Sequence, residues 1–337
     1  MNRFLEIDAL RAFACVIILV AHTCQEFSLL PGADPLAKVI HDFLWQIDLG
    51  RSAVIVFFSI SGYVICSTIK GERKSGSINF WGRRLFRLYP VFWLSNIAAL
   101  LFIFWPTNSI SIAQFIANLT MTPKVFGYES LVAVYWTLET ELMFYFLSWL
   151  IFMLGFHNKA QMLLLMCTLL VLLTLVFIVN REIAPDYHYW RAMPYHISFM
   201  FWAALYRLFN DKPTEKVYFG RINLSHKAIF IIATTIVLMP ALLALWVYTQ
   251  TQDVIALRNS VSYIIGVFAF ITLTRWIPLR SKILAHIGNY TYAIYLFHAI
   301  VILSLIHFIK IYAPNLGTWP ILFWISAIFQ SLQGLGK

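Results

Sequence analysis

Runs of apolar residues follow one another along the whole chain, separated by short polar connections. Each run is about 20 residues long, the length at which an α-helix crosses the hydrocarbon core of a bilayer. The pattern predicts ten spans, near residues 8–28, 45–69, 85–106, 131–154, 160–180, 192–209, 226–248, 257–275, 287–309 and 318–334. The apolar stretch at residues 109–121 is too short to cross, and we expect an interfacial or re-entrant segment there.

The composition supports this interpretation, because 61% of the 337 residues are hydrophobic and only 12% are charged. In a soluble protein about a quarter of the residues are charged. We therefore expect an all-α, polytopic membrane protein with about ten transmembrane helices in one bundle. Since no hydrophilic stretch is long enough for a second globular domain, residues 1–337 are expected to form a single transmembrane domain. The four cysteines lie in apolar stretches and are expected to be buried, and no metal site is predicted.

The net charge of +10 is explained by membrane topology, and no nucleic-acid partner is expected. With the N-terminus in the cytoplasm, the connections 70–84, 155–159, 210–225 and 276–286 and the C-terminus are cytoplasmic as well. This arrangement places 18 of the 25 Lys and Arg residues on the cytoplasmic side and seven on the other side. The positive-inside rule therefore favours ten spans with both chain ends in the cytoplasm.

The first span carries Arg11 and, eleven residues later, His22. Eleven residues turn an α-helix only about 20° past three full turns, so both side chains lie on one face, roughly 16 Å apart. Ionisable residues inside spans usually face a bundle interior or a water-filled cavity. Arg11 alone is also explained by snorkelling to the cytoplasmic interface, and His22 alone by an interfacial position. Together with Asp8, they favour a polar stripe along a cavity.

A cluster of arginines precedes the third span, in the sequence NFWGRRLFRLYPVFW at residues 79–93. Arg84 and Arg87 are three residues apart and therefore share one helix face. One interpretation is a positive-inside anchor with an aromatic belt. The other is an anion site, because guanidinium groups bind phosphate bidentately, and a phosphorylated carrier such as coenzyme A would fit.

Two acidic residues, Glu139 and Glu141, enter the outer end of the fourth span. A position in the first turn of a helix, where the helix dipole favours acids, explains Glu139 better than Glu141. Because the two residues are two positions apart, they point to different faces, and at most one of them is expected to share a site with His22.

Five sequence elements, taken together, resemble the integral-membrane acyltransferase-3 family, bacterial O-acyltransferases that modify sugars. The elements are Asp8-x-Leu10-Arg11-x10-His22, FFSISGYVI at 57–65, Arg84-x-x-Arg87-x-Tyr89-Pro90, Trp136-Thr137-Leu138-x-x-Glu141 followed by Phe144-Tyr145, and TYAIYLFH at 291–298. The resemblance covers nearly the whole chain and is to the stand-alone members, which lack an SGNH-type hydrolase domain. Two positions depart from the family pattern, Leu142 in place of a second acid and Thr291 in place of a serine.

The resemblance implies transfer of an acyl group, most simply acetyl, from cytosolic acyl-CoA to a hydroxyl of a cell-surface carbohydrate or glycolipid. The expected location is the bacterial cytoplasmic membrane, with acyl-CoA as co-substrate and no bound cofactor. His22 is the expected general base, Glu141 would orient it, and the arginines Arg11, Arg84 and Arg87 would bind the donor. Further residues expected to line the cavity are Asp8, Ser61, Tyr89, Trp136, Glu139, Tyr145 and His298.

Two other functions are compatible with the residues alone. A proton-coupled transporter or polysaccharide exporter would also place Arg, His and Glu inside a bundle of ten spans. A haem protein could use His22 and His298 as axial ligands. The first alternative is the stronger of the two, although neither inverted repeats nor paired helix breaks are evident.

Overall fold

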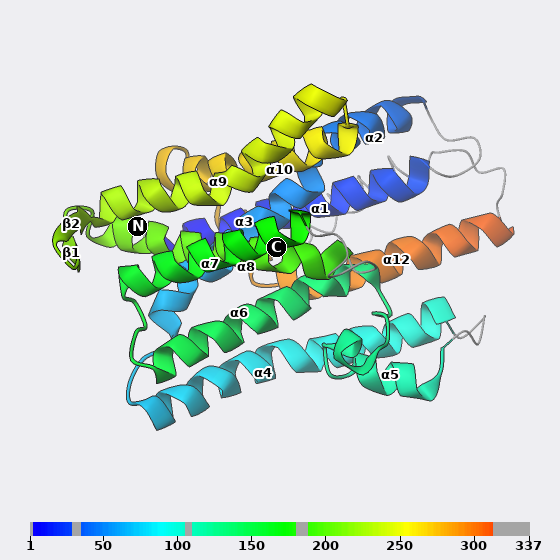
Figure 1. The fold of residues 1–337 in the computed structure, drawn as a ribbon. Coiled ribbons are helices and arrows are strands. Elements are labelled where there is room, and N and C mark those ends of the chain that lie inside the picture. Colours follow the sequence, from blue (N-terminus) through cyan, green and yellow to red (C-terminus); the bar gives the residue numbers. More distant parts are fainter. Residues whose placement is uncertain (1–2, 29–34, 105–109, 180–187, 313–337) are drawn as a thin grey trace. The chain divides into compact units, whose positions relative to one another are not determined.

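The protein is almost entirely helical in a computed structural model that describes residues 3–28, 35–104, 110–179 and 188–312 (Figure 1). The all-α fold class is therefore confirmed. The elements in chain order are α1 (Arg3–Ser28), α2 (Pro35–Ile47), α3 (Leu49–Thr68), α4 (Arg73–Ala99), η1 (Leu100–Phe104), α5 (Ile112–Asn118), η2 (Pro123–Phe126), η3 (Ala133–Tyr135), α6 (Trp136–Met153), α7 (Ala160–Val179), α8 (His188–Asp211), β1 (Lys216–Phe219), β2 (Ile222–Ser225), α9 (His226–Thr251), α10 (Val254–Ile271), η5 (Thr272–Trp276), α11 (Lys282–Gly288) and α12 (Thr291–Tyr312).

Seven helical segments within the described residues are long and apolar enough to cross a membrane. They are Leu5–Ser28, Leu49–Thr68, Arg73–Phe104, Ala160–Val179, His226–Thr251, Val254–Trp276 and Thr291–Tyr312. The spans expected at 131–154 and 192–209 are helical too, as α6 and α8, but their charged and polar residues lower their hydropathy. The tenth expected span, 318–334, lies outside the described residues.

The α7 helix illustrates how apolar side chains point away from the protein. Its mean hydropathy of 3.1 is the highest of the seven spans, yet only 22% of its apolar stretch is buried inside the protein. Leu169 and Leu172 are about half exposed, and Val179 more than that. Such a surface is unfavourable in water and favourable against lipid tails, which supports a membrane-spanning chain.

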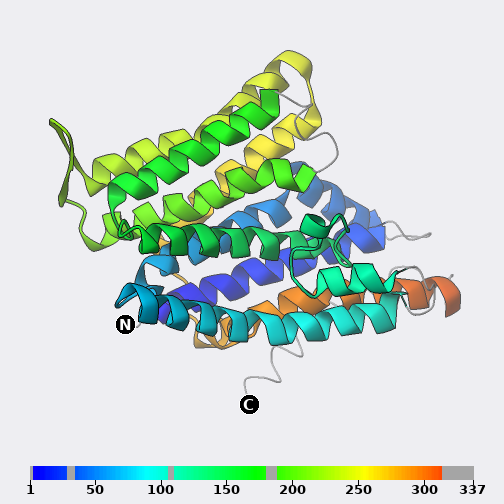
Figure 2. The ribbon, with the colours of Figure 1, turned by 60° about the horizontal axis from the view of Figure 1, so that its bottom comes forward.

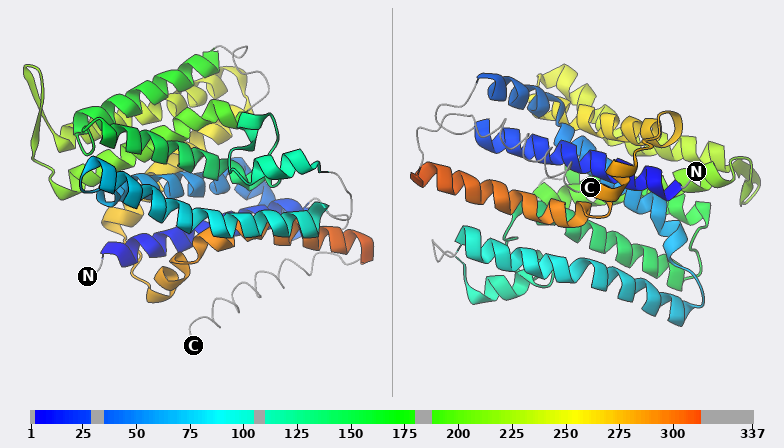
Figure 3. Two further views of the ribbon diagram at one scale, coloured as in Figure 1. Left: turned by 90° about the horizontal axis from the view of Figure 1, so that it is seen from below. Right: turned by 180° about the vertical axis from the view of Figure 1, so that it is seen from behind.

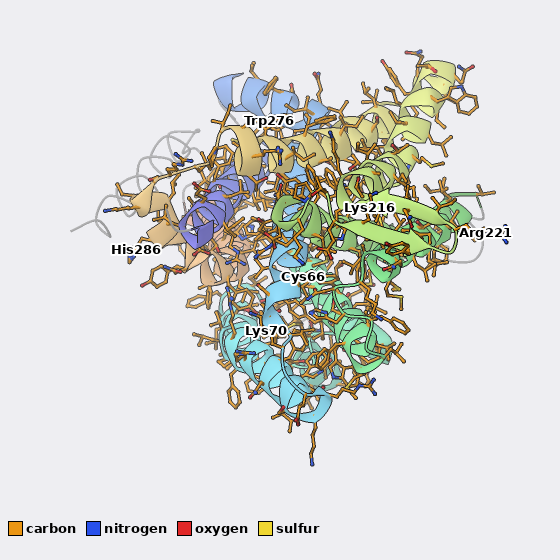
Figure 4. All side chains as sticks on the ribbon, turned by 90° about the vertical axis from the view of Figure 1, so that its left-hand side faces the viewer. Cys66, Lys70, Lys216, Arg221, Trp276 and His286 are labelled. Carbon is orange, nitrogen blue, oxygen red and sulfur yellow. The ribbon has the colours of Figure 1, made fainter. Side chains whose placement is uncertain are left out.

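The connections between the spans contain more regular structure than the sequence indicates. Helix α4 begins at Arg73, so most of the predicted cytoplasmic connection 70–84 is helical. The connection 210–225 contains an antiparallel hairpin, β1–β2, in which Lys216 pairs with Ser225 and Phe219 with Ile222. Lys216 and Arg221 of this hairpin are labelled in Figure 4. The stretch 276–286 contains the start of α11, and α2 precedes the second span.

The described contacts divide the chain into two compact units. Unit 1 comprises residues 1–54, 88–135 and 265–337, and unit 2 comprises residues 55–87 and 136–264. Helices α3, α4 and α10 therefore have residues in both. The expectation of a single domain over 1–337 stays a prediction.

In unit 1, α1 packs along α11 and α12 (Figure 3). The face of α1 that carries Leu10 and Ile18 is almost completely buried. Towards the other end of the contact, Phe27 packs in an apolar cluster with Ile302, Ile306 and Ile309 of α12. The contact therefore holds the second half of α1 beside α12, although the two helices are far apart in the sequence.

In unit 2, helices α7, α8 and α9 pack against one another (Figure 2). The core is aromatic, because the fully buried rings of Trp202 and Tyr206 on α8 both contact Phe230 on α9. The Trp202 indole donates a hydrogen bond of 2.9 Å to Thr234, which satisfies its polar atom inside the helix packing.

Glycines allow two particularly close helix contacts. An ideal Cβ on Gly62 of α3 would lie 1.9 Å from the Met200 carbonyl oxygen of α8. In unit 1, a Cβ on Gly288 of α11 would lie 2.1 Å from the carbonyl oxygen of Asp8 on α1. Neither backbone atom can be displaced by a rotamer change, so both positions require glycine for packing.

We expect Gly62→Ala to separate α3 from α8 and to lower the free energy of unfolding by about 1–3 kcal/mol or more, as overpacking of a core does. The loss would be measured by thermal unfolding of the purified protein in detergent. Unfolding is monitored by labelling of the Cys167 thiol, which is buried in the folded protein. The matched control is Gly82→Ala in α4, where nothing lies within 4 Å of an added Cβ. Equal stability of the two variants would contradict the packing argument.

Candidate functional site

The residues singled out from the sequence fall in both units. Unit 1 holds Asp8, Arg11, His22, Tyr89 and His298, and unit 2 holds Ser61, Arg84, Arg87, Trp136, Glu139, Glu141 and Tyr145. The structure brings several of these residues together within each unit. The orientation of His22 by Glu141 links residues of different units and stays a prediction.

Arg11 and His22 both lie on α1, a continuous helix from Arg3 to Ser28, as the sequence predicts. Near the start of α1, Arg11 forms an ion pair of 2.9 Å with Asp8, and both side chains are largely shielded. Gly288 of α11 packs against the backbone at Asp8, so this pair lies at a close helix contact. The ion pair places Asp8 and Arg11 together on α1, and their expected position along a cavity stays a prediction.

His22 lies next to a second histidine. Its imidazole ring and that of His298 on α12 have centroids 5.3 Å apart, with the planes tilted by 38°. Gly50 of α3 lies against Ala21, the residue before His22. The negative charge of the nearby Asp48 acts on His22. Within unit 1, the histidine thus has an imidazole and a carboxylate as neighbours.

The protonation pattern of His298 follows from its hydrogen bond. Its Nδ1 faces the carbonyl oxygen of Tyr295, which can only accept, so Nδ1 carries the hydrogen. The other nitrogen, Nε2, then has a free lone pair. It is buried and has no hydrogen-bond partner among the described residues, while the side chain is only 6% exposed. His298 therefore offers an unused hydrogen-bond acceptor beside His22.

Hydroxyl groups of three motif tyrosines join distant segments of unit 1. Tyr89 donates a hydrogen bond of 2.9 Å to the carbonyl of Thr120, and Tyr292 donates one of the same length to the carbonyl of Leu88. Tyr295 similarly donates to the carbonyl of Val134 over 3.1 Å. The hydrogen bond to Thr120 gives Tyr89 a structural role. Its expected position along the cavity stays a prediction.

In unit 2, Glu141 of α6 is the centre of a polar network. Its carboxylate accepts a hydrogen bond of 2.9 Å from Ser61 on α3 and another from the hydroxyl of Tyr145, one turn along α6. Ser61 belongs to the FFSISGYVI element, so two motifs that are separate in the sequence meet at this carboxylate.

Arg84 of α4 extends the network. Its Nη1 donates a hydrogen bond of 3.0 Å to the Tyr145 hydroxyl, and its Nη2 donates one of 3.3 Å to Thr68. The guanidinium carbon also lies 4.4 Å from the centroid of the Tyr145 ring, a cation–π geometry. Arg84 is thus held in a fixed orientation and retains further N–H groups.

Arg87 differs from Arg84. Its side chain is exposed and makes no hydrogen bond or ion pair to any residue that the structure describes, while its charge acts on Tyr145. The two arginines therefore form a fixed cation and a free cation on adjacent turns of α4.

The remaining predicted residues, Trp136 and Glu139, lie at the start of α6. Glu139 is in the first turn and is 5% exposed, so it is more buried than Glu141. Trp136 packs against Phe58 and His196, with ring centroids 6.0 and 5.0 Å away. The helix-dipole explanation for Glu139 agrees with its position.

The structure differs from the sequence prediction in the placement of Arg84 relative to Glu141. The sequence assigns them to opposite ends of their spans, whereas Tyr145 joins them directly. The reason is that α4 starts at Arg73, so Arg84 lies about three turns after the start of the helix and not in its first turn. Two neighbours were not predicted, Thr68 beside Arg84 and Asp48 beside His22.

The geometry also bears on metal and haem binding. Within the described residues, no three His, Cys, Asp or Glu side chains form a group that could hold a metal ion. His22 and His298 have ring centroids 5.3 Å apart with planes tilted by 38°, closer together than two imidazoles on opposite faces of one haem iron. The pair therefore does not fit two axial ligands of one haem.

Comparison with known protein families gives a match over nearly the whole chain. A family model described as an acyltransferase domain, that of the acyltransferase-3 family, matches residues 4–332. No curated protein and no solved structure matches the chain. The resemblance inferred from the five sequence elements is confirmed over nearly the whole chain.

We expect Tyr145→Phe to lower the free energy of unfolding by about 1.5–3 kcal/mol, the usual contribution of hydrogen bonds to charged groups. The change removes the hydroxyl shared by Glu141 and Arg84 and keeps the ring. Thermal unfolding in detergent would measure it, with Tyr218→Phe on the exposed hairpin as control. If both variants unfold at the wild-type temperature, the network does not stabilise unit 2.

Proposed function

The chain belongs to the acyltransferase-3 family, and we propose that it is a membrane O-acyltransferase that uses cytosolic acyl-CoA. The acceptor would be a hydroxyl group of a cell-surface carbohydrate or glycolipid, and the simplest acyl group is acetyl. The observation that carries the proposal is the family match over residues 4–332 together with a half-buried histidine, His22, on the first span. The family favours acyl transfer over the alternative of a proton-coupled transporter.

His22 would act as the general base. A thioester is already activated, so the step that needs help is deprotonation of the acceptor hydroxyl, and histidine is suited to it near neutral pH. The hydroxyl proton goes to His22 while the oxygen bonds to the thioester carbonyl carbon. The C–S bond then breaks, and the coenzyme A thiolate takes the proton from the imidazolium. The carboxylate of Asp48, whose charge acts on His22, would stabilise that imidazolium.

The arginines of α4 would bind the phosphates of the donor. Arg84 is held by Tyr145 and Thr68, so its orientation is set before the donor arrives, and Arg87 is exposed and unpaired within the described residues. A fixed and a free guanidinium on one face suit the several phosphate groups of coenzyme A. Arg11, already paired with Asp8, would line the donor path.

We propose a location in the bacterial cytoplasmic membrane with both chain ends in the cytoplasm. The distribution of basic residues supports this orientation, because the hairpin with Lys216 and Arg221 and the start of α4 then face the cytosol. Coenzyme A thioesters are supplied on that side.

We expect His22→Ala to lower the rate of acetyl transfer by about 10²–10⁴-fold, the usual contribution of a general base. The assay uses purified protein, labelled acetyl-CoA and a glycan acceptor extracted from the cell surface. His22→Gln, which keeps a polar side chain without a basic nitrogen, should be equally slow. The control is His307→Ala on the exposed side of α12. Wild-type rates in both His22 variants would refute the assignment of the base.

We expect the double variant Arg84→Ala, Arg87→Ala to weaken binding of coenzyme A and to flatten its dependence on salt, because two phosphate contacts are lost. Titration across a salt series would measure both effects. Arg83→Ala, Lys74→Ala provides the control, since it removes the same charge from the same helix. If the two double variants bind alike, Arg84 and Arg87 are topology anchors and not donor ligands.

The acceptor would be identified by mass spectrometry of surface glycans from deletion and wild-type cells. Loss of a mass step equal to one acyl group would give both the group and its acceptor. Glycans of identical mass in the two strains would argue against a surface carbohydrate as acceptor.

A further inference from the structure

A cavity of about 220 Å³ lies between α1 and α12 in unit 1, beside the His22–His298 pair. The two helices run side by side in Figure 3. All but two of the lining side chains are apolar, and the two polar ones are Thr23 and His298. The lining residues are Leu19, Thr23 and Phe27 of α1 and Ile294, Phe297, His298, Val301, Ile302 and Leu305 of α12.

The cavity is elongated along the helices. Leu19, Thr23 and Phe27 follow one another at intervals of one helical turn and extend over about 12 Å. From His298, the wall on α12 continues through Val301 and Ile302 to Leu305. Towards the far end, the lining residues Phe27 and Ile302 pack in the apolar cluster with Ile306 and Ile309.

The size of the cavity exceeds what an acetyl group requires. An apolar cavity of about 150 Å³ in another protein holds a benzene ring and stays free of water. By that comparison, 220 Å³ accommodates an apolar chain of about six carbons.

The end of the cavity at His298 is polar, which favours a reacting ligand over a lipid tail as the occupant of the cavity. The buried Nε2 of His298 needs a hydrogen-bond donor, which a hydrocarbon tail does not supply. A reaction at His22 does supply one, because the acceptor hydroxyl and the protonated His22 are both donors. The cavity thus begins where the acyl carbonyl would react and continues into apolar surroundings.

We propose that the cavity between α1 and α12 binds the hydrocarbon chain of the transferred acyl group, and that the enzyme accepts chains of about six carbons as well as acetyl. The proposal rests on the proposed function, since it names the acyl group of that reaction. Val301 and Leu305 then determine the chain length, because they line the part of the cavity beyond His298.

The test compares acetyl-CoA with hexanoyl-CoA as donors for the wild-type protein and for Val301→Phe, which fills the cavity. We expect kcat/KM for hexanoyl-CoA to fall about tenfold or more relative to that for acetyl-CoA, because pocket discrimination of this kind is typically 10–200-fold. Leu303→Phe, on α12 but outside the lining, is the matched control and should leave the ratio unchanged. Leu305→Ala, which lengthens the cavity, should shift the preference towards octanoyl-CoA.

Equilibrium binding of hexanoyl-CoA and acetyl-CoA to the same proteins separates this inference from the proposed function. If the wild-type protein transfers neither group but binds hexanoyl-CoA more tightly, and Val301→Phe abolishes the difference, the cavity is supported and the proposed function fails. If transfer occurs and no lining variant changes the ratio of the two donors, the inference is overturned. The inference is also overturned if binding is independent of both chain length and Val301→Phe, as expected where a bilayer lipid fills the cavity.

Discussion

A charged side chain inside a membrane-spanning helix is costly unless another group pairs with it, and this constraint organises both units of the protein. Arg11 is paired with Asp8 on the same helix, and Glu141 accepts hydrogen bonds from Ser61 and Tyr145. Arg84 is bound by Tyr145 and Thr68. Each pairing also fixes the position of the side chain, so the same contacts that make the charges tolerable also orient them.

The tyrosines show how this constraint is met with little flexibility. Tyr145 donates through its hydroxyl to Glu141, accepts from Arg84 and presents its ring to the same guanidinium. Tyr292 and Tyr295 use their hydroxyls to bind backbone carbonyls of distant segments. A tyrosine combines an apolar body with one polar atom at its tip, so it can join helices within an apolar environment. These three tyrosines therefore have structural roles, whatever else they do.

The sequence predicts best those features that depend on one helix at a time. The period of the helix places Arg11 and His22 on one face of α1, and the length of apolar runs locates the spans. Contacts between distant segments were not predictable in this way. The meeting of Ser61 with Glu141 and that of His22 with His298 depend on helix packing, which no local pattern encodes. The start of α4 at Arg73 was missed because its first turns are polar, and a search for apolar runs passes over them.

The position of Asp48 determines part of the electrostatic environment of His22. Its backbone adopts a left-handed conformation, with φ of 43°, and its carboxylate accepts the N–H of Arg51 in the first turn of α3. The side chain is thus a helix cap, held by the backbone it terminates and by the guanidinium of Arg51. The negative charge beside His22 is consequently positioned by where a neighbouring helix begins. A shift in that starting point would alter the electrostatics of the histidine without any change in the residues that touch it.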